Sequence, residues 1–344
     1  MAWADVARAL CVLGVVLMHT VITVQAFGFA IEPWRWFVDA MGPFRMSALS
    51  MISGLLLSRR IRAGWADEGV RVSVALSAWL YATWLLLFTL FALTVGAFLW
   101  VGPLASGDAL GTWQAFARQL VLPRTVLWYV LALAVWTAVL ATLRRVSPAI
   151  VLVALAALSA TSFWMPVLEG SDQYRNICRY AFFFALGVYG ARFVRDALAR
   201  HAAGVFTAAL GAFALLQSVV VITGIASIEN LLSVPRDAAG ALVVLSGALF
   251  LAAVPLLGRA LAWIGRRTLP IYVTHALLLE TLILFPGWWV PLVQHHAFAR
   301  AISPLIITLG CAAAAIAVHA LVMRTPMRVI FALPGPIRRR LTRA

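Results

Sequence analysis

Residues 8–28 read RALCVLGVVLMHTVITVQAFG, an apolar run that opens with an arginine and holds one histidine near its centre. A helix needs about 20 apolar residues to cross the hydrocarbon core of a bilayer. The stretch therefore predicts a membrane-spanning helix, and we expect an all-α polytopic integral membrane protein with about ten such helices. The predicted spans are residues 8–28, 40–57, 72–98, 125–143, 149–166, 179–194, 203–224, 239–257, 269–287 and 301–323.

The composition agrees with this expectation. Hydrophobic residues make up 64% of the 344 and charged residues 11%, against about half and about a quarter in soluble domains. This excludes a water-soluble globular enzyme. Short connections join the runs, so we expect one transmembrane domain over residues 1–330 and a basic cytoplasmic tail over residues 331–344. Three scattered cysteines are too few for a disulfide framework or a zinc site, and we expect no metal site.

The arginines indicate the orientation. All 27 basic residues are arginines, and nineteen fall on one set of alternating connections and the two ends of the chain. Because cytoplasmic loops are enriched in basic residues, this bias predicts cytoplasmic termini in a multi-pass protein of the inner (plasma) membrane. Topology then accounts for most of the net charge of +15, so we expect no nucleic-acid partner. The eight arginines on the opposite side are Arg35, Arg45, Arg118, Arg124, Arg175, Arg179, Arg236 and Arg300.

Arg8 and His19 are the first candidate functional pair, since ionisable residues inside a membrane span are costly. Eleven residues separate them, which is about 16 Å along a helix and within about 20° of a whole number of turns. Both side chains therefore project from one face, with His19 near the bilayer midplane. A buried histidine can also serve helix packing alone, but the aligned arginine favours function.

The second span opens with PFRMSALSMISG, residues 43–54. Ser47, Ser50 and Gly54 recur at spacings of three and four, which predicts a small-residue face where another helix approaches closely. Arg45, near the outer end of this span, belongs either to the membrane interface or to an acceptor site.

A basic cluster follows this span in SRRIRAG, residues 58–64. The planar guanidinium group binds phosphate through two parallel hydrogen bonds. Arg59, Arg60 and Arg62 can therefore clamp an anionic cofactor at the helix end, or they can serve only as topology determinants.

Two further features lie on the predicted outer side. Arg175 and Arg179 are one helical turn apart and can bind an anionic acceptor or headgroup, or pair with Glu169 or Asp172. Trp128 begins the fourth span, where an aromatic belt at the membrane interface and stacking on a sugar are both open.

The ninth span carries a second buried histidine. His275 follows Tyr272 by three residues, so the two share a helix face, and we favour a structural hydrogen-bonding role over a pocket-lining one. Glu280, nearer the outer end, needs a partner within the membrane. That partner is either the acceptor or an outer arginine such as Arg45 or Arg179.

Several of these motifs together resemble the integral-membrane acyltransferase-3 family of O-acyltransferases. The arrangement R-x10-H from Arg8 to His19 is similar to the signature of that family, and Arg59 and Arg62 match its R-x-x-R element. Three more stretches resemble its helix ends in the same order along the chain: MISGLLL (51–57), LWYVLAL (127–133) and WIGRRTLPIYVTHALLL (263–279).

The resemblance implies ten helices and transfer of an acyl group, usually acetyl, from cytoplasmic acyl-CoA to a hydroxyl of a cell-envelope sugar or glycolipid. Acyl-CoA is then the donor substrate, no cofactor stays bound, and the partners are membrane lipid, donor and acceptor. A neutral histidine is well suited to remove a hydroxyl proton near neutral pH. We therefore expect His19 to be the general base, with Arg8 orienting the site or holding a CoA phosphate beside Arg59, Arg60 and Arg62.

A proton-coupled transporter or flippase of an envelope precursor is the competing hypothesis, because it too can use a midplane histidine and arginine. It predicts inverted repeats with broken helices at matching positions of the two halves. No such repeat stands out in the sequence. A purely structural scaffold is disfavoured by the many ionisable residues within the spans, and the residues indicate no oligomeric state.

Overall fold

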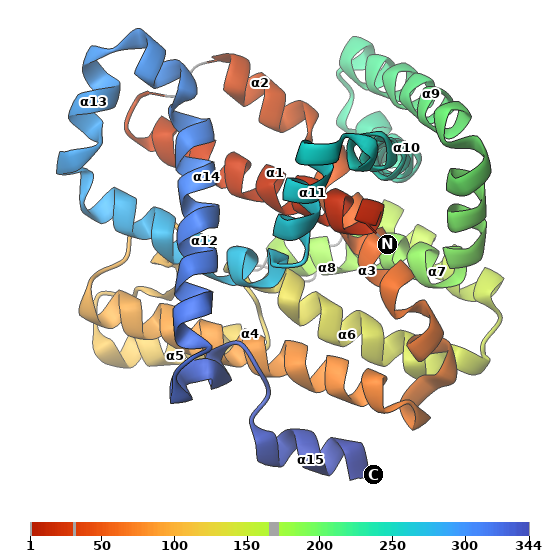
Figure 1. Cartoon of the computed structure of the whole chain (residues 1–344), viewed down its shortest axis with the longest axis horizontal. Coiled ribbons are helices and arrows are strands. Elements are labelled where there is room, and N and C mark those ends of the chain that lie inside the picture. The colour runs from red at the N-terminus through yellow and green to blue at the C-terminus, as the bar shows by residue number, and fades with distance from the viewer. Residues whose placement is uncertain (1, 30–31, 165–171, 344) are drawn as a thin grey trace.

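The computed structural model describes residues 2–29, 32–164 and 172–343, which form helices and connections without a β-strand. The all-α prediction is therefore confirmed (Figure 1). The α-helices are α1 (Ala2–Ala26), α2 (Glu32–Ala40), α3 (Gly42–Ala63), α4 (Glu68–Thr94), α5 (Ala109–Gln119), α6 (Trp128–Thr142), α7 (Pro148–Thr161), α8 (Asp172–Tyr189), α9 (Ala191–Thr223), α10 (Ala226–Ala253), α11 (Pro255–Gly265), α12 (Thr268–Leu284), α13 (Val290–His295), α14 (Ala297–Val322) and α15 (Gly335–Arg343). Short 3-10 turns lie at Gly64–Ala66, Gly102–Leu104, Leu143–Arg145, Ser162–Trp164, Pro286–Trp288 and Pro326–Ile330.

Within the described residues, six helical segments are long and apolar enough to cross a bilayer: Ala2–Ala26, Glu32–Ala66, Glu68–Thr94, Ala191–Thr223, Ala226–Ala253 and Ala297–Val322. The pair α11 and α12, bent by 74°, is a seventh candidate. The predicted fourth span falls on α6, whose 15 residues reach only about 22 Å. The count of ten and the side of the termini therefore stay predictions.

Helix α1 runs through the middle of the molecule and packs against α3, α10, α11, α12 and α14 (Figure 1). Small residues on its buried side allow these helices to come close. At Gly265, the last residue of α11, an added Cβ would lie 1.8 Å from the carbonyl oxygen of Asp5. This contact places the junction of α11 and α12 against the first turns of α1.

The close helix approach predicted for the second span is confirmed at Gly54 by the packing of α3 on α8. A Cβ on Gly54 would lie 2.0 Å from the carbonyl oxygen of Phe184, and one on Gly187 would lie 2.0 Å from that of Met51. Each helix therefore presents a glycine to the backbone of the other. Since α8 carries Arg179, this contact helps to position that arginine.

The outer helices are apolar where they leave the protein core. In α9, which curves along the edge of the molecule (Figure 1), Phe193, Leu215 and Ile222 are 78%, 67% and 82% exposed. Such a surface is compatible with contact to lipid, because no hydrophobic driving force buries apolar side chains against protein when the surroundings are lipid tails. The backbone of α9 is non-helical at His201, which lies between the predicted sixth and seventh spans.

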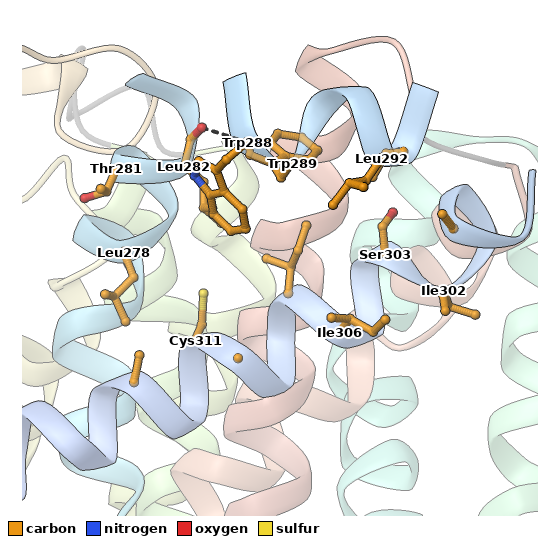
Figure 2. Close-up of a pocket in the computed structure, with 15 residues that line it drawn as sticks. Leu278, Thr281, Leu282, Trp288, Trp289, Leu292, Ile302, Ser303, Ile306 and Cys311 are labelled. Carbon is orange, nitrogen blue, oxygen red and sulfur yellow. Dashed lines mark hydrogen bonds between the residues drawn. The ribbon is translucent and has the colours of Figure 1, made fainter. Parts of the chain in front are cut away.

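An apolar cavity of about 570 Å³ lies between α12, α13 and α14 (Figure 2). Leu278, Leu282 and Ile306 line it, and the indole of Trp289 donates a hydrogen bond of 3.0 Å to the Leu282 carbonyl. It shares none of its lining residues with the cavity beside His19 described below.

The end of the chain is attached to α4. The indoles of Trp79 and Trp84 donate to the carbonyls of Val329 and Ile330 at 2.7 and 2.9 Å. Arg71 donates to the carbonyl of Leu341 in α15 at 3.0 Å. The division into a domain over 1–330 and a tail over 331–344 remains a prediction, although the described part of that tail is helical.

Candidate active site

His19 and His275 meet in the interior of the protein, although 256 positions separate them in the chain. Nδ1 of His19, on α1, lies 2.8 Å from Nε2 of His275, on α12. Their ring planes are tilted by only 13°, with centroids 5.0 Å apart. His275 is fully buried and His19 is 9% exposed. The structure therefore joins the two histidines that the sequence placed on separate spans.

The hydrogen bonds of this pair define its tautomers. Nδ1 of His275 lies 2.6 Å from the carbonyl oxygen of Tyr272, and because a carbonyl only accepts, this nitrogen carries the proton. With both rings neutral, Nε2 of His275 accepts the Nδ1 proton of His19. Nε2 of His19 is then the unprotonated nitrogen and holds a free lone pair, as a general base requires.

Trp100 supports the His19 ring from another side. Their ring centroids are 4.5 Å apart, and the indole donates to the Thr23 hydroxyl at 3.1 Å. That hydroxyl donates to the His19 carbonyl at 2.9 Å. Thr23, expected on the same polar stripe as His19, thus connects the histidine to the loop after α4.

Glu280 anchors the same loop. The prediction that Arg45 or Arg179 pairs with this carboxylate is therefore wrong. Its buried carboxylate accepts the backbone N–H groups of Phe98, Leu99 and Trp100, the last at 2.7 Å. Three amide donors can satisfy a carboxylate away from water without a cation. Glu280 therefore holds Trp100 in place against His19.

His19 lines a polar cavity of about 510 Å³. Three of the predicted substrate-binding residues, Arg45, Trp128 and Arg179, line it as well. Trp128 is 7% exposed and its ring stacks 5.9 Å from that of Tyr180, so it faces protein. Arg45 donates to the Val38 carbonyl at 2.5 Å and contacts the Met18 sulfur at 3.1 Å.

The cavity also contains residues that were not among the sequence candidates: Tyr180, Asn176, Thr125, Arg124, Arg236 and Glu229. The sequence did point to two of these residues, because Arg124 and Arg236 belong to the eight arginines on the predicted outer side. Their convergence could not be read from the sequence because they lie in separate elements.

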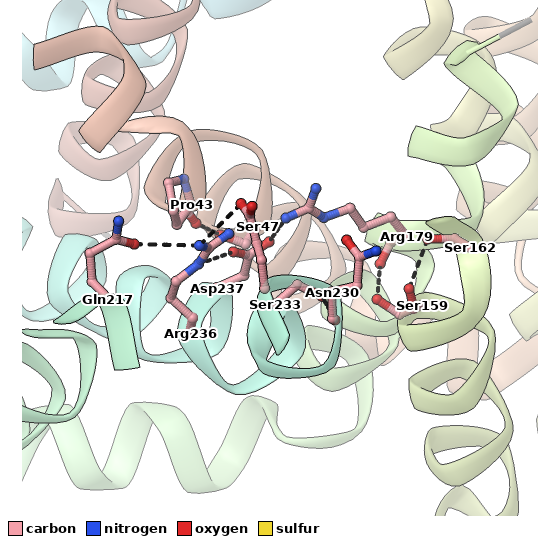
Figure 3. Close-up of polar contacts among 11 residues, drawn as sticks. Pro43, Ser47, Ser159, Ser162, Arg179, Gln217, Asn230, Ser233, Arg236 and Asp237 are labelled. Carbon is pink, nitrogen blue, oxygen red and sulfur yellow. Dashed lines mark hydrogen bonds and ion pairs between the residues drawn. The ribbon is translucent and has the colours of Figure 1, made fainter. Parts of the chain in front are cut away.

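Arg179 pairs with an acid that the sequence did not suggest. Its guanidinium lies 2.7 Å from a carboxylate oxygen of Asp237 on α10 (Figure 3). Glu169, one predicted partner, lies outside the described residues, and Arg175 lies one turn before Arg179 on α8. Asp237 is fully buried, so this ion pair ties α8 to α10 within the protein.

Arg8 lies at the other end of α1. Its Nε donates to the Gly265 carbonyl at 3.1 Å, its Nη2 donates to the same oxygen, and it lies 3.9 Å from Asp5. With Arg266, Arg8 lines a second cavity of about 360 Å³. Tyr272 lines both cavities, so the residue that fixes the His275 tautomer lies between them.

The predicted anion clamp is not gathered around Arg8. Arg62 donates to the carbonyls of Val188 and Tyr189 at the end of α8, at 3.1 and 2.8 Å. Arg59 and Arg60 are exposed, and none of the three is among the residues that line the second cavity. In the described residues, Arg266 is the arginine that accompanies Arg8 there.

The fold and this site define a polytopic membrane protein with a buried histidine pair beside a polar cavity. A family model described as an acyltransferase domain, that of the acyltransferase-3 family, matches residues 1–324. The chain therefore belongs to the acyltransferase-3 family, and the resemblance drawn from its motifs is confirmed. Searches among curated proteins and solved structures return no match. Membership supports acyltransferase activity in a membrane protein.

Proposed function

We propose that this protein is an inner-membrane O-acyltransferase that moves an acyl group, usually acetyl, from cytoplasmic acyl-CoA to a hydroxyl of an envelope sugar or glycolipid. The observation that carries the proposal is the His19–His275–Tyr272 chain of hydrogen bonds beside a polar cavity. It leaves Nε2 of His19 as a base at a place where a hydroxyl compound can bind.

In this mechanism the acceptor hydroxyl lies in the cavity and gives its proton to Nε2 of His19. The hydroxyl oxygen attacks the thioester carbonyl, the carbon–sulfur bond breaks, and the CoA thiolate takes the proton back from His19. The products are an ester and free CoA. While His19 is protonated, its Nδ1–H still donates to His275, whose other nitrogen is held by the Tyr272 carbonyl.

The donor enters from the Arg8 end of α1 in this proposal. Arg8 and Arg266 line the second cavity, and two guanidinium groups there suit a CoA phosphate or the developing charge of the reaction. The part of CoA that lies outside this cavity can still bind at the same membrane face to Arg59, Arg60 and Arg62. Tyr272, shared by both cavities, marks the region where the thioester and the hydroxyl would meet.

The test is acyl transfer by purified protein, followed as release of free CoA from acetyl-CoA in the presence of envelope extract. His19→Ala is expected to lower turnover by about 10²- to 10⁴-fold, the range typical of a general base. His295→Ala is the matched control, since this histidine is exposed on α13. Unimpaired turnover by a folded His19→Ala protein would refute the mechanism, and substrate movement without CoA release would favour a transporter.

A further inference from the structure

Four arginines from four parts of the chain meet at the cavity beside His19. Arg45 comes from α3, Arg124 from the segment before α6, Arg179 from α8 and Arg236 from α10. All four fall on the predicted outer side, which the positive-inside rule would keep poor in basic residues. Orientation in the membrane therefore does not explain them, and their convergence needs another cause.

The acids near this cavity do not satisfy the guanidinium groups completely. Asp237 serves both Arg179, at 2.7 Å, and Arg236, at 3.7 Å (Figure 3). Glu229 lies 3.5 Å from Arg236 and is 53% exposed. The Nε atoms of Arg179 and Arg236 are buried and have no hydrogen-bond partner among the described residues.

Thr125 and Arg45, also at the cavity, have hydrogen-bond donors that are not fully used. The hydroxyl of Thr125, which is 1% exposed and lines the cavity, has no hydrogen-bond partner in the part of the chain that the structure describes. Arg45 contacts a carbonyl oxygen and a thioether, and within residues 2–29, 32–164 and 172–343 no hydrogen bond or ion pair joins it to a carboxylate. Among the described residues, Asp39 and Glu229 are the acids that line the cavity, whereas Asp237 does not line it. In the described part of the chain, the four arginines thus have three acids near them, and Asp237 is shared by two of the arginines.

We infer that the acceptor of the proposed reaction carries an oxyanion group, a phosphate, sulfate or carboxylate, which this arginine cluster binds while the acceptor hydroxyl faces His19. Arg236 is buried, Arg45 and Arg179 are half-buried, and Arg124 is exposed. Cations withdrawn from water are costly unless paired, and guanidinium groups match the oxygens of such anions geometrically. Arg45 is the link between the two functions, because it contacts Met18, the residue next to His19. This inference rests on the proposed function and narrows its acceptor class.

The experiment uses the full-length protein, radiolabelled acetyl-CoA and total envelope extract from a strain that lacks the protein. After phase separation into organic solvent and water, the labelled product is first separated from unreacted acetyl-CoA and acetate, which are anions themselves, and is then passed over an anion exchanger at neutral pH. We expect the label to be retained by the exchanger. Retention from the organic phase identifies an anionic lipid or glycolipid, and retention from water an anionic sugar. A neutral labelled product overturns this inference alone, whereas the absence of any labelled product contradicts the proposed function.

Arginine variants provide a second measurement. Arg45→Gln and Arg124→Gln leave no buried carboxylate unpaired, so both proteins are expected to fold. Each should raise the amount of acceptor needed for half-maximal rate by at least about tenfold, with little change in the KM for acetyl-CoA. Arg118→Gln, exposed and outside the cavity, is the control. Equal acceptor requirements for all three variants would overturn the inference.

Discussion

At the scale of single residues, His19 has a defined protonation pattern because His275 has one. The Tyr272 carbonyl requires a proton on Nδ1 of His275, and this leaves Nε2 of His275 to accept from His19. The same logic is familiar from catalytic triads, in which a third group holds the tautomer of the base. In the proposed mechanism His275 is therefore a positioning residue that acts through His19.

Replacing His275 separates this role from a packing role. His275→Ala removes the acceptor for the Nδ1 proton of His19, and we expect kcat to fall at least about tenfold but less than for His19→Ala. The KM values should change little. His275→Gln, whose side-chain oxygen can accept the same proton, is expected to recover part of the lost kcat.

The measurement compares kcat and KM for the wild-type protein and for the His275→Ala and His275→Gln variants. Thermal unfolding is the control for folding. If the kcat of His275→Gln were no higher than that of His275→Ala while both variants unfolded at the same temperature, the hydrogen bond to His19 would not explain the role of His275. If His275 had only a packing role, both variants would unfold at a lower temperature. Their kcat values would then fall in proportion to the fraction of folded enzyme.

At the scale of helices, glycines decide how closely α3 and α8 can pack. The Cβ positions of Gly54 and Gly187 lie 2.0 Å from carbonyl oxygens of the facing helix, well inside contact distance. The two backbones must separate to accept any side chain. Because α3 carries Arg45 and α8 carries Arg179, such a separation would also widen the cavity beside His19.

We therefore expect Gly54→Ala to lower the stability of the protein by about 1–3 kcal/mol, the usual range for overpacking. The matched control is Gly204→Ala in α9, where nothing lies within 4 Å of the added Cβ. That substitution should be neutral or stabilising by up to about 1 kcal/mol. Thermal unfolding in detergent measures both, and equal melting temperatures for the two variants would contradict the close contact.

At the scale of the whole molecule, charge and cavities divide the protein into two ends. Arg8 and Arg266 line the cavity at one end of α1, and the four-arginine cluster lines the cavity at the other. The positive-inside rule assigns the first end to the cytoplasm. The predicted pair of cytoplasmic termini requires an even number of membrane crossings, and six or seven helical segments among the described residues meet the length criterion.

Reporter fusions test this arrangement. Green fluorescent protein fused to the C-terminus is expected to fluoresce, and alkaline phosphatase fused there is expected to be inactive, because its disulfides form only outside the cytoplasm. Phosphatase fused after residue 29, between α1 and α2, should be active and serves as the control. An active phosphatase at the C-terminus would show an odd number of crossings and contradict the predicted topology.

The sequence by itself determined what depends on neighbouring residues. Apolar runs of bilayer length predicted a helical membrane protein, and the period of one helix placed Arg8 and His19 on one face of α1. Ordered motifs indicated the family. Small residues on α3 predicted a close helix contact, although not the helix that would make it.

Only the tertiary structure decided which distant residues meet. The His19–His275 pair, the amide partners of Glu280 and the convergence of Arg45, Arg179 and Arg236 join elements far apart in the chain. Such contacts follow from how helices pack against each other, and helical periodicity indicates a face without naming its partner. The sequence thus suggested His19 as a base and showed an excess of arginines on the predicted outer side, while packing placed His19 and four of these arginines at one cavity.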